Sequence, residues 1–272
     1  MELARAGDPT PLVCTIGDLI LDVIVLPKAP LVPDADTPAT IRLAAGGQAA
    51  NVAAWAADLG ARSRLICKRG DDAASELAGA ALARHGVEIC GPVVEGPGGV
   101  VVSTRDGGGG RMMASDRGVA ARLEPAELAP AWLESSDVLH VSGYCLLYEP
   151  MADAAIEAAR LSSRVTVDLA SAHDIELVGA RRFARRLNAL GAELAFATEA
   201  ERAAVPEFDG GWVIKLGARG AWFPEGFYAA PPVQAVDTTG AGDALAAGYL
   251  VGGPELAIEA AARSVRTIGA MP

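Results

Sequence analysis

Short apolar runs alternate with amphipathic stretches along most of the chain. The apolar runs have the length and composition of buried strands and lie at 13–18, 19–26, 63–68, 137–143, 164–170, 192–198 and 211–217. The stretches with helical periodicity lie at 48–60, 73–86, 150–161 and 176–191. Gly60 and Gly86 end the first two, as glycine commonly does at a helix C-terminus. This alternation predicts an α/β fold in which helices cover both faces of a mostly parallel sheet.

Two segments interrupt the alternation and have no helical periodicity. Residues 27–45 are rich in proline and then alternate like an edge strand. Residues 91–116 contain two strand-like runs, VVVST and RMMAS, joined by the turn sequence RDGGGG. We expect both segments to form a small β lid on a single domain that comprises residues 1–272.

Composition and charge exclude several classes of function. The formal net charge is -11 and aromatic residues make up 5% of the chain, which argues against binding nucleic acid or an anionic membrane. No apolar stretch is long enough for a membrane span, and the first residues do not resemble a signal peptide. The four cysteines are far apart and form no CxxC pair. We therefore expect a cytoplasmic protein whose partner is a small molecule.

The stretch DTTGAGDALAAGYL, residues 237–250, combines a turn of very small residues with the start of a helical pattern. Gly240, Ala241 and Gly242 allow backbone N–H groups to approach a ligand, and the helix N-terminus adds its dipole. Such a loop can stabilise the negative charge of a phosphoryl group during transfer, and Asp243 beside it could accept a proton from an attacking hydroxyl. The alternative is that Asp243 only caps the helix.

A second glycine pair opens the helix predicted at 48–60. Gly46 and Gly47 would allow the backbone to approach a ligand, and Asn51 lies one turn into the helix, where its amide could bind hydroxyl groups. The alternative is an ordinary glycine turn before an amphipathic helix. Asp168 lies at the C-terminal end of the strand predicted within 164–170, a position at which open α/β sheets bind ligands, although a capping or structural role is equally compatible with the sequence.

These two motifs, in this order, resemble the signature regions of the ribokinase-like (PfkB) family of carbohydrate and nucleoside kinases. The resemblance extends over nearly the whole chain and includes GDLILD (17–22), CKRGDDAASELAGAALARHGVE (67–88) and KLGARG (215–220). It implies a three-layer α/β/α sandwich with a mostly parallel central sheet and a β lid. It also implies an ATP-dependent kinase that phosphorylates a hydroxymethyl group of a sugar or sugar-like substrate, and a homodimer formed through the lid.

The resemblance also implies a role for each residue that matches a family motif. These are Asp243 as catalytic base with Gly240, Ala241 and Gly242 as the anion hole; Asp22, Gly46, Gly47 and Asn51 for the substrate; Thr198, Lys215, Gly217 and Gly220 for the nucleotide; Glu201 for Mg²⁺ through water; and Asp237 for a monovalent cation such as K⁺.

Two departures from the family pattern leave alternatives open. Thr198 stands where the family usually has the asparagine of an Asn-x-x-Glu motif, and Ala262 stands where an asparagine or histidine is expected near the adenine. The last helical stretch is also about one turn shorter than the family pattern. A nucleoside kinase of the same family, or a ligand-binding sensor that has lost turnover, therefore remain alternatives to the sugar kinase. The absence of a GxxxxGK[ST] or GxGxxG motif argues against a P-loop or dinucleotide-binding protein.

Overall fold

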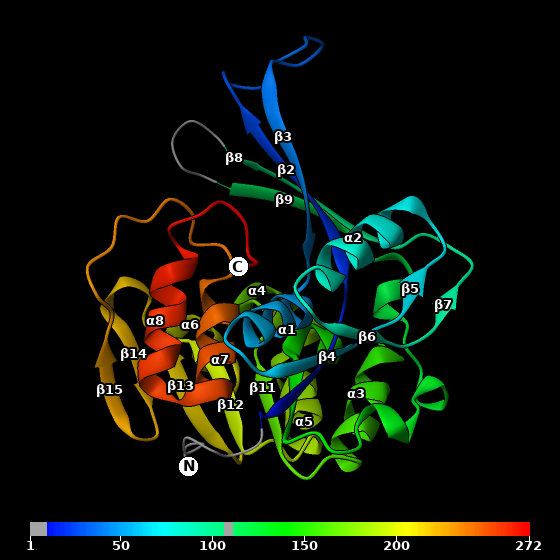
Figure 1. Cartoon of the computed structure of the whole chain (residues 1–272), viewed down its shortest axis with the longest axis vertical. Helices are drawn as coiled ribbons and strands as arrows, with labels where there is room; N and C mark the ends of the chain where they lie inside the picture. Colours follow the sequence, from blue (N-terminus) through cyan, green and yellow to red (C-terminus); the bar gives the residue numbers. More distant parts are fainter. Residues whose placement is uncertain (1–9, 106–110) are drawn as a thin grey trace.

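The computed structural model describes residues 10–105 and 111–272, and its largest element is a nine-stranded sheet (Figure 1). The strand order is β15-β14-β13-β12-β11-β10-β1-β4-β6. The bounds are β1 (Leu12–Ile16), β4 (Arg62–Ile66), β6 (Glu88–Cys90), β10 (Val138–Ser142), β11 (Val165–Asp168), β12 (Leu194–Thr198), β13 (Gly211–Lys215), β14 (Gly220–Phe223) and β15 (Gly226–Ala229). All neighbours are parallel except β13–β14 and β14–β15, which are antiparallel. The predicted mostly parallel sheet is confirmed.

Helices cover both faces of this sheet because successive strand residues point to opposite sides. Val13 of β1 packs with α1 (Gln48–Asp58), α7 (Ala241–Gly252) and α8 (Pro254–Ser264). Its neighbour Cys14 belongs to the opposite core, with α3 (Met151–Arg160) and α5 (Ala180–Ala189). The remaining α-helices are α2 (Ala73–Ala83), α4 (Ala172–Val178) and α6 (Glu199–Ala204). The result is the three-layer α/β/α sandwich.

A second, four-stranded sheet of order β3-β2-β8-β9 projects from one end of this sandwich (Figure 1). Its strands are β2 (Ile20–Pro27), β3 (Ala39–Gly46), β8 (Gly99–Arg105) and β9 (Arg111–Asp116). The predicted pairing of VVVST with RMMAS is confirmed by the antiparallel register of β8 and β9, while the turn at 106–110 lies outside the described residues.

The second sheet differs from the predicted lid segments in its limits. It includes β2, which precedes the segment 27–45, because β2 pairs with both β3 and β8. Residues 91–98 do not belong to it. Their strand β7 (Val93–Val94) pairs instead with β5 (Arg69–Gly70).

Two further details of the sandwich were predicted incorrectly or missed. The helix expected at 176–191 is divided at Gly179, whose φ of 94° ends α4 and allows α5 to begin at once. The antiparallel pair β14–β15 was not predicted, because its strands are only four residues long. Among the helices of the described ranges, none combines the length and hydropathy that a bilayer crossing requires.

The fold gathers polar residues at one end of the main sheet. The parallel strands β10, β11, β12 and β13 all finish at the same edge, and Asp168, Thr198 and Lys215 are the last residues of the latter three. Open α/β sheets bind ligands at this carboxyl edge.

Candidate active site

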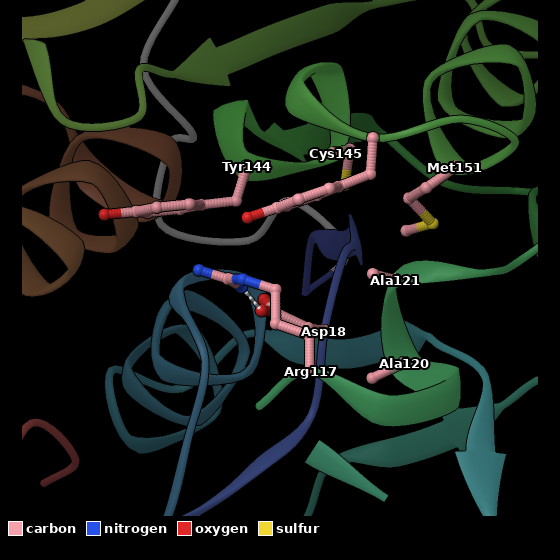
Figure 2. A pocket seen from close by; sticks show the side chains of 8 residues that line it. Asp18, Arg117, Ala120, Ala121, Tyr144, Cys145 and Met151 are labelled. Atoms are coloured by element: carbon pink, nitrogen blue, oxygen red, sulfur yellow. Dashed lines mark hydrogen bonds and ion pairs between the residues drawn. The ribbon is translucent and has the colours of Figure 1, made fainter. Parts of the chain in front are cut away.

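The glycine pair before α1 is bordered by two carboxylates. A Cβ placed on Gly46 would lie 2.3 Å from Oδ2 of Asp22, so the Asp22 carboxylate rests directly against this backbone. Gly47 caps α1 with a φ of 101°, and a Cβ there would lie 2.3 Å from the carbonyl oxygen of Asp18. Both glycines are therefore required for the chain to pass this closely. Asp18 in turn forms an ion pair with Arg117 (Figure 2).

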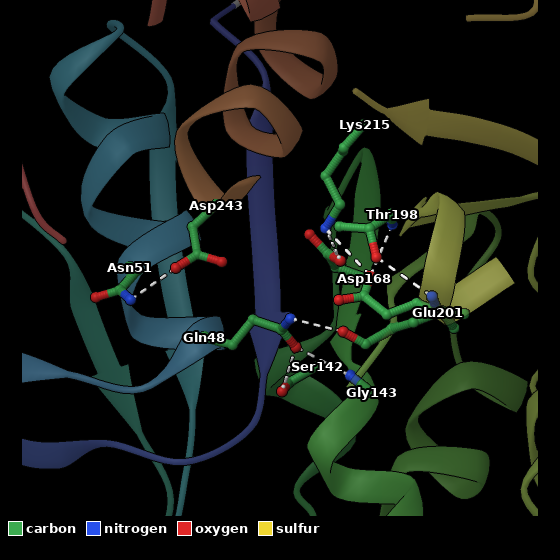
Figure 3. A network of polar contacts seen from close by, with 10 residues as sticks. Gln48, Asn51, Ser142, Gly143, Asp168, Thr198, Glu201, Lys215 and Asp243 are labelled. Atoms are coloured by element: carbon green, nitrogen blue, oxygen red, sulfur yellow. Dashed lines mark hydrogen bonds and ion pairs between the residues drawn. The ribbon is translucent and has the colours of Figure 1, made fainter. Parts of the chain in front are cut away.

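The predicted base, Asp243, lies in the first turn of α7 and is joined to Asn51 of α1. The Asn51 Nδ2 atom donates a hydrogen bond of 2.7 Å to Oδ2 of Asp243 (Figure 3). Burial, together with the negative charge of Asp168, raises the pKa of Asp243 to about 7, although Asn51 and Lys215 oppose the shift. A carboxyl group with this pKa can take up and release a proton near neutral pH.

The glycine loop before α7 leads directly into a helix N-terminus. Gly240 caps the helix with a φ of 75°, in the left-handed region that favours glycine. The amides of Gly242 and Asp243 lie in the first helical turn, where N–H groups have no partner within the helix. A bound anion can therefore accept hydrogen bonds from them.

The last residues of the chain pack against this loop. A Cβ on Gly240 would lie 2.6 Å from the Cα atom of Ala270, and Trp55 Nε1 donates a 2.8 Å hydrogen bond to the Ala270 carbonyl oxygen. Asp237 is buried, and its carboxylate accepts hydrogen bonds from the backbone N–H of Thr239 (3.0 Å) and of Gly269 (3.2 Å). Asp237 thus connects the loop to the C-terminal segment.

Lys215 lies beside the glycine loop before α7, in contact with Asp168. Its Nζ atom is 2.5 Å from Oδ1 of Asp168 and 3.9 Å from Oε2 of Glu201 (Figure 3). A Cβ on Gly242 would lie 3.2 Å from the same Nζ atom. Burial opposes the charge of Lys215, but Asp168 and Glu201 raise its pKa above the ordinary value. Lys215 is therefore a cation held against the loop, a placement that its predicted nucleotide role did not specify.

Asp168 belongs to this cluster, so the interpretation of Asp168 as a ligand-site residue gains support over simple capping. Its side chain is fully buried, and burial raises its pKa to about 6 although Lys215 acts in the opposite direction. The strand-end position was the signal in the sequence. The pairing with Lys215 could not be read from the sequence, because the two residues are 47 positions apart.

Thr198 and Glu201 form a reciprocal capping box at the start of α6. Thr198 Oγ1 accepts a 3.2 Å hydrogen bond from the Glu201 N–H, and Glu201 Oε2 accepts a 2.7 Å bond from the Thr198 N–H. The threonine hydroxyl that replaces the expected asparagine is thus engaged in the cap.

Gln48, which the sequence reasoning missed, ties the start of α1 to the ends of two strands. Its Nε2 atom donates to the Leu169 carbonyl oxygen at 3.1 Å, and its Oε1 atom accepts from Ser142 Oγ at 2.7 Å and from the Gly143 N–H at 3.1 Å (Figure 3). The only signal was its position directly after the glycine pair. Gln48 fixes the glycine turn relative to the carboxyl edge of the sheet.

Gly217 and Gly220 lie farther from this cluster, in the connection between β13 and β14. Gly220 has a φ of 114°, and a Cβ there would lie 2.0 Å from the carbonyl oxygen of Tyr228 in the neighbouring strand β15, so this position requires glycine. In the described part of the chain no side-chain hydrogen bond or ion pair joins either glycine to Asp243 or Lys215. Their predicted nucleotide contacts stay a prediction.

Comparison with known proteins agrees with this geometry. The family model described as pfkB family carbohydrate kinase matches residues 10–271. The ATP-dependent ribose-1-phosphate kinase of Halopiger xanaduensis is 33% identical over 238 residues, which cover 80% of this chain and 77% of the relative.

Solved structures of other proteins have the same fold. The adenosine kinase of Sinorhizobium meliloti superposes with a TM-score of 0.81 at 24% identity, covering 97% of this chain and 96% of that one. The ribokinase of Thermotoga maritima superposes with a TM-score of 0.73 at 20% identity, covering 96% of each chain. At these identities the likeness shows the fold alone.

Proposed function

The chain belongs to the pfkB family of carbohydrate kinases, and we propose that it transfers the γ-phosphoryl group of ATP to a hydroxymethyl group of a sugar or sugar-like molecule. The observation that carries this proposal is the position of Asp243. A carboxyl group with a pKa of about 7 lies at the start of a glycine-flanked helix N-terminus, next to a buried lysine. Binding alone would not need a base at this point.

The substrate lies between Asp22, the Gly46–Gly47 turn and Asn51. The Oδ1 atom of Asn51 is buried and has no hydrogen-bond partner among the described residues, so it can accept a hydrogen bond from a sugar hydroxyl. The same side chain holds Asp243 through Nδ2. Asn51 therefore aligns the sugar with the base.

Asp243 accepts the proton of the attacking hydroxyl as the new O–P bond forms and the bond from the γ-phosphorus to the bridging oxygen of ADP breaks. The N–H groups at the start of α7 stabilise the charge on the transferred group. Lys215, beside Gly242, adds a positive charge on the same side. Asp168 keeps that lysine protonated and in place.

Glu201 would hold Mg²⁺ through water. The carboxylate of Glu201 fits this role, because Oε2 is used in the cap while no hydrogen bond or ion pair in the described ranges engages Oε1, which can accept from a water ligand of the ion. Mg²⁺ commonly keeps several waters and needs few carboxylates when phosphates are present. Bound Mg²⁺ supplies charge neutralisation on the phosphates. The K⁺ site proposed at Asp237 is supported less directly, since both carboxylate oxygens already accept hydrogen bonds from backbone N–H groups.

The ATP site is proposed to extend from Lys215 toward Thr198, Gly217 and Gly220. The carboxyl ends of β12 and β13 place Thr198 and Lys215 side by side, because they are register partners. The glycine-rich hairpin that follows β13 presents backbone rather than side chains to a nucleotide.

The second sheet is proposed to act as the lid and as the dimer interface. Leu43, Val23 and Val102 are register partners and share one face, on which Leu43 is 57% and Val102 is 37% exposed. Ile41 (61%) and Met112 (64%) lie on the same face. Asp22 points to the other face. A second copy of the chain is the proposed occupant of the apolar face, and the cytoplasm is the proposed location.

ATP consumption against a panel of acceptors tests the function. The panel contains free pentoses and hexoses, ribose 1-phosphate and adenosine, since relatives named for the last two compounds are similar to this chain. Turnover with one acceptor that is absent in Asp243→Asn establishes the kinase and its substrate. Thermal stabilisation by an acceptor without any turnover would refute the kinase in favour of the ligand-binding sensor, which Thr198 and Ala262 favour.

A further inference from the structure

A second polar cluster borders the glycine turn, where the chain passes between the two sheets. Asp18 lies between β1 and β2, and Arg117 directly follows β9. These residues form the ion pair of Figure 2, and only 5% of Asp18 is exposed. We call Asp18, Arg117, Tyr144 and Tyr148 the Arg117 cluster.

The guanidinium of Arg117 is stacked on the two tyrosines. Its Cζ atom lies 4.6 Å from the centroid of the Tyr144 ring and 5.6 Å from that of Tyr148. The residues of the cluster line a common cavity. Figure 2 shows the Tyr144 hydroxyl and the guanidinium pointing to the same side. The side chain of Arg117 keeps 18% exposure, and Asp18 occupies one of its nitrogen atoms.

The cluster adjoins the place where the sugar is proposed to lie. The Oδ1 atom of Asp18 is 3.4 Å from a Cβ placed on Gly47. This oxygen is buried and has no hydrogen-bond partner in the part of the chain that the structure describes. A buried acceptor without a partner costs stability, and a sugar hydroxyl on the glycine turn would supply the missing donor.

The remaining groups of the cluster are donors. A guanidinium has several N–H groups and no acceptor, and a tyrosine hydroxyl can donate as well. Their natural complement is an oxyanion, which has only acceptor atoms and the opposite charge. Asp18 does not prevent such binding, because it engages one guanidinium nitrogen and a guanidinium carries five N–H groups.

We propose that the Arg117 cluster is an oxyanion subsite, and that the sugar phosphorylated by this protein already carries an anionic group such as a phosphate. Arg117 and the tyrosine hydroxyls bind the anion, and Asp18 orients the guanidinium and accepts a hydroxyl of the same sugar. The inference rests on the proposed function to the extent that the sugar lies on Gly46–Gly47.

Calorimetry without ATP tests the subsite separately from turnover. Two matched pairs of probes are compared: ribose 1-phosphate with ribose, and gluconate with glucitol. An anionic probe is expected to bind about 10- to 100-fold more tightly than its neutral partner, as charge-assisted hydrogen bonds allow. Preference for ribose 1-phosphate identifies a phosphate, and preference for gluconate identifies a carboxylate.

Variants assign the preference to the cluster. Arg117→Gln should remove it while changing the affinity for the neutral partner less than about threefold. Arg117→Lys keeps the positive charge but not the planar arrangement of N–H donors in a guanidinium. It should therefore retain part of the preference for the anionic probe. Tyr144→Phe removes a single donor and should cost the anionic probe alone about three- to tenfold. Arg122→Gln is the matched control, an exposed arginine of the same segment, and should behave as wild type.

The outcomes are decisive for the subsite. Equal affinity for anionic and neutral probes, binding of neither anion, or an anion preference that persists in folded Arg117→Gln would each overturn the proposal. Binding of ribose 1-phosphate that depends on Arg117, without turnover when ATP is added, supports the subsite and refutes the kinase. Turnover of a neutral sugar that is unaffected by Arg117→Gln would support the kinase and refute the subsite.

Discussion

Replacement of Asp243 by asparagine should abolish catalysis and yet stabilise the fold. The amide oxygen of the new side chain can still accept the hydrogen bond from Asn51, so the local geometry is preserved. The amide cannot take up the proton of the attacking hydroxyl, and kcat should fall by about 10²–10⁴, the usual contribution of a general base. In the wild type, kcat/KM should rise with pH through about 7, as Asp243 loses its proton.

The stability gain follows from the raised pKa of Asp243. A carboxyl with a folded-state pKa of about 7 instead of 3.8 stabilises the fold most below pH 3.8. Between pH 3.8 and about 7 the unfolded chain has released this proton while the folded protein still holds it. The wild type therefore loses stability as the pH rises through this range and loses no more above about pH 7. The full shift corresponds to about 4 kcal/mol at about 1.4 kcal/mol per unit. Because Asp243 is only partly buried, screening by solvent reduces this to about 2 kcal/mol at pH 8.

Thermal unfolding of the two proteins between pH 4 and pH 8 measures the effect. A gain of about 2 kcal/mol corresponds to an increase in Tm of about 4–8 °C at pH 8 for a chain of this size. The difference should shrink as the pH falls toward 4. Asp153→Asn is the matched control, because Asp153 lies in the first turn of α3 but is exposed. A Tm difference that does not change with pH, or one of the opposite sign, would refute the account of Asp243 as a buried, destabilised carboxylate.

Three further changes test the neighbouring parts of the site. Lys215→Met should lower kcat about 10²-fold in steady-state assays, the usual cost of one electrostatic donor, with little change in the KM of the sugar. It should also destabilise the fold, because Asp168 is left without its ion-pair partner, and adding Asp168→Asn should restore the stability but not kcat. Gly240→Ala should lower the free energy of unfolding, measured with urea, by at least about 1–2 kcal/mol, because φ is positive and the new Cβ meets Ala270. Leu43→Asp should convert the proposed dimer into monomers in sedimentation experiments, whereas a monomeric wild type would disprove the interface.

The chain's alternating pattern was sufficient to predict the middle strands of the central sheet but not the strands β6, β14 and β15 at its two ends, because a buried parallel strand requires a continuous apolar run and these short strands lack one. The runs at 137–143, 164–170, 192–198 and 211–217 correspond to β10, β11, β12 and β13 with small differences at their ends. The division of the helix at 176–191 was not foreseen, because one glycine within a helical pattern is usually tolerated.

The candidate site was predictable where a motif is contiguous and not where it depends on packing. Gly240 to Asp243 occupy four consecutive positions and carry their own conformational requirement, so the sequence indicated the loop directly. Arg117 follows a lid strand and has no local feature that marks it as a site residue. The proposed role of Arg117 depends on its contacts with Asp18, which is 99 positions away, and with two tyrosines that follow β10. Such a cluster exists only once the sheet order is fixed.

The loop before α7 is stabilised by contacts with distant parts of the chain, and this explains how a loop of small residues can keep a fixed geometry. Glycine and alanine have little side chain with which to fix a backbone, so the loop before α7 needs external contacts. Asp237 supplies one by binding Gly269, and Ala270 supplies another by packing against Gly240. Trp55 of α1 holds Ala270 in place through its indole N–H. Because α1 also carries Asn51, the same helix positions the proposed base directly through Asn51 and the proposed anion hole indirectly through Ala270. The C-terminal segment is therefore part of the framework that would align Asp243 with the proposed substrate.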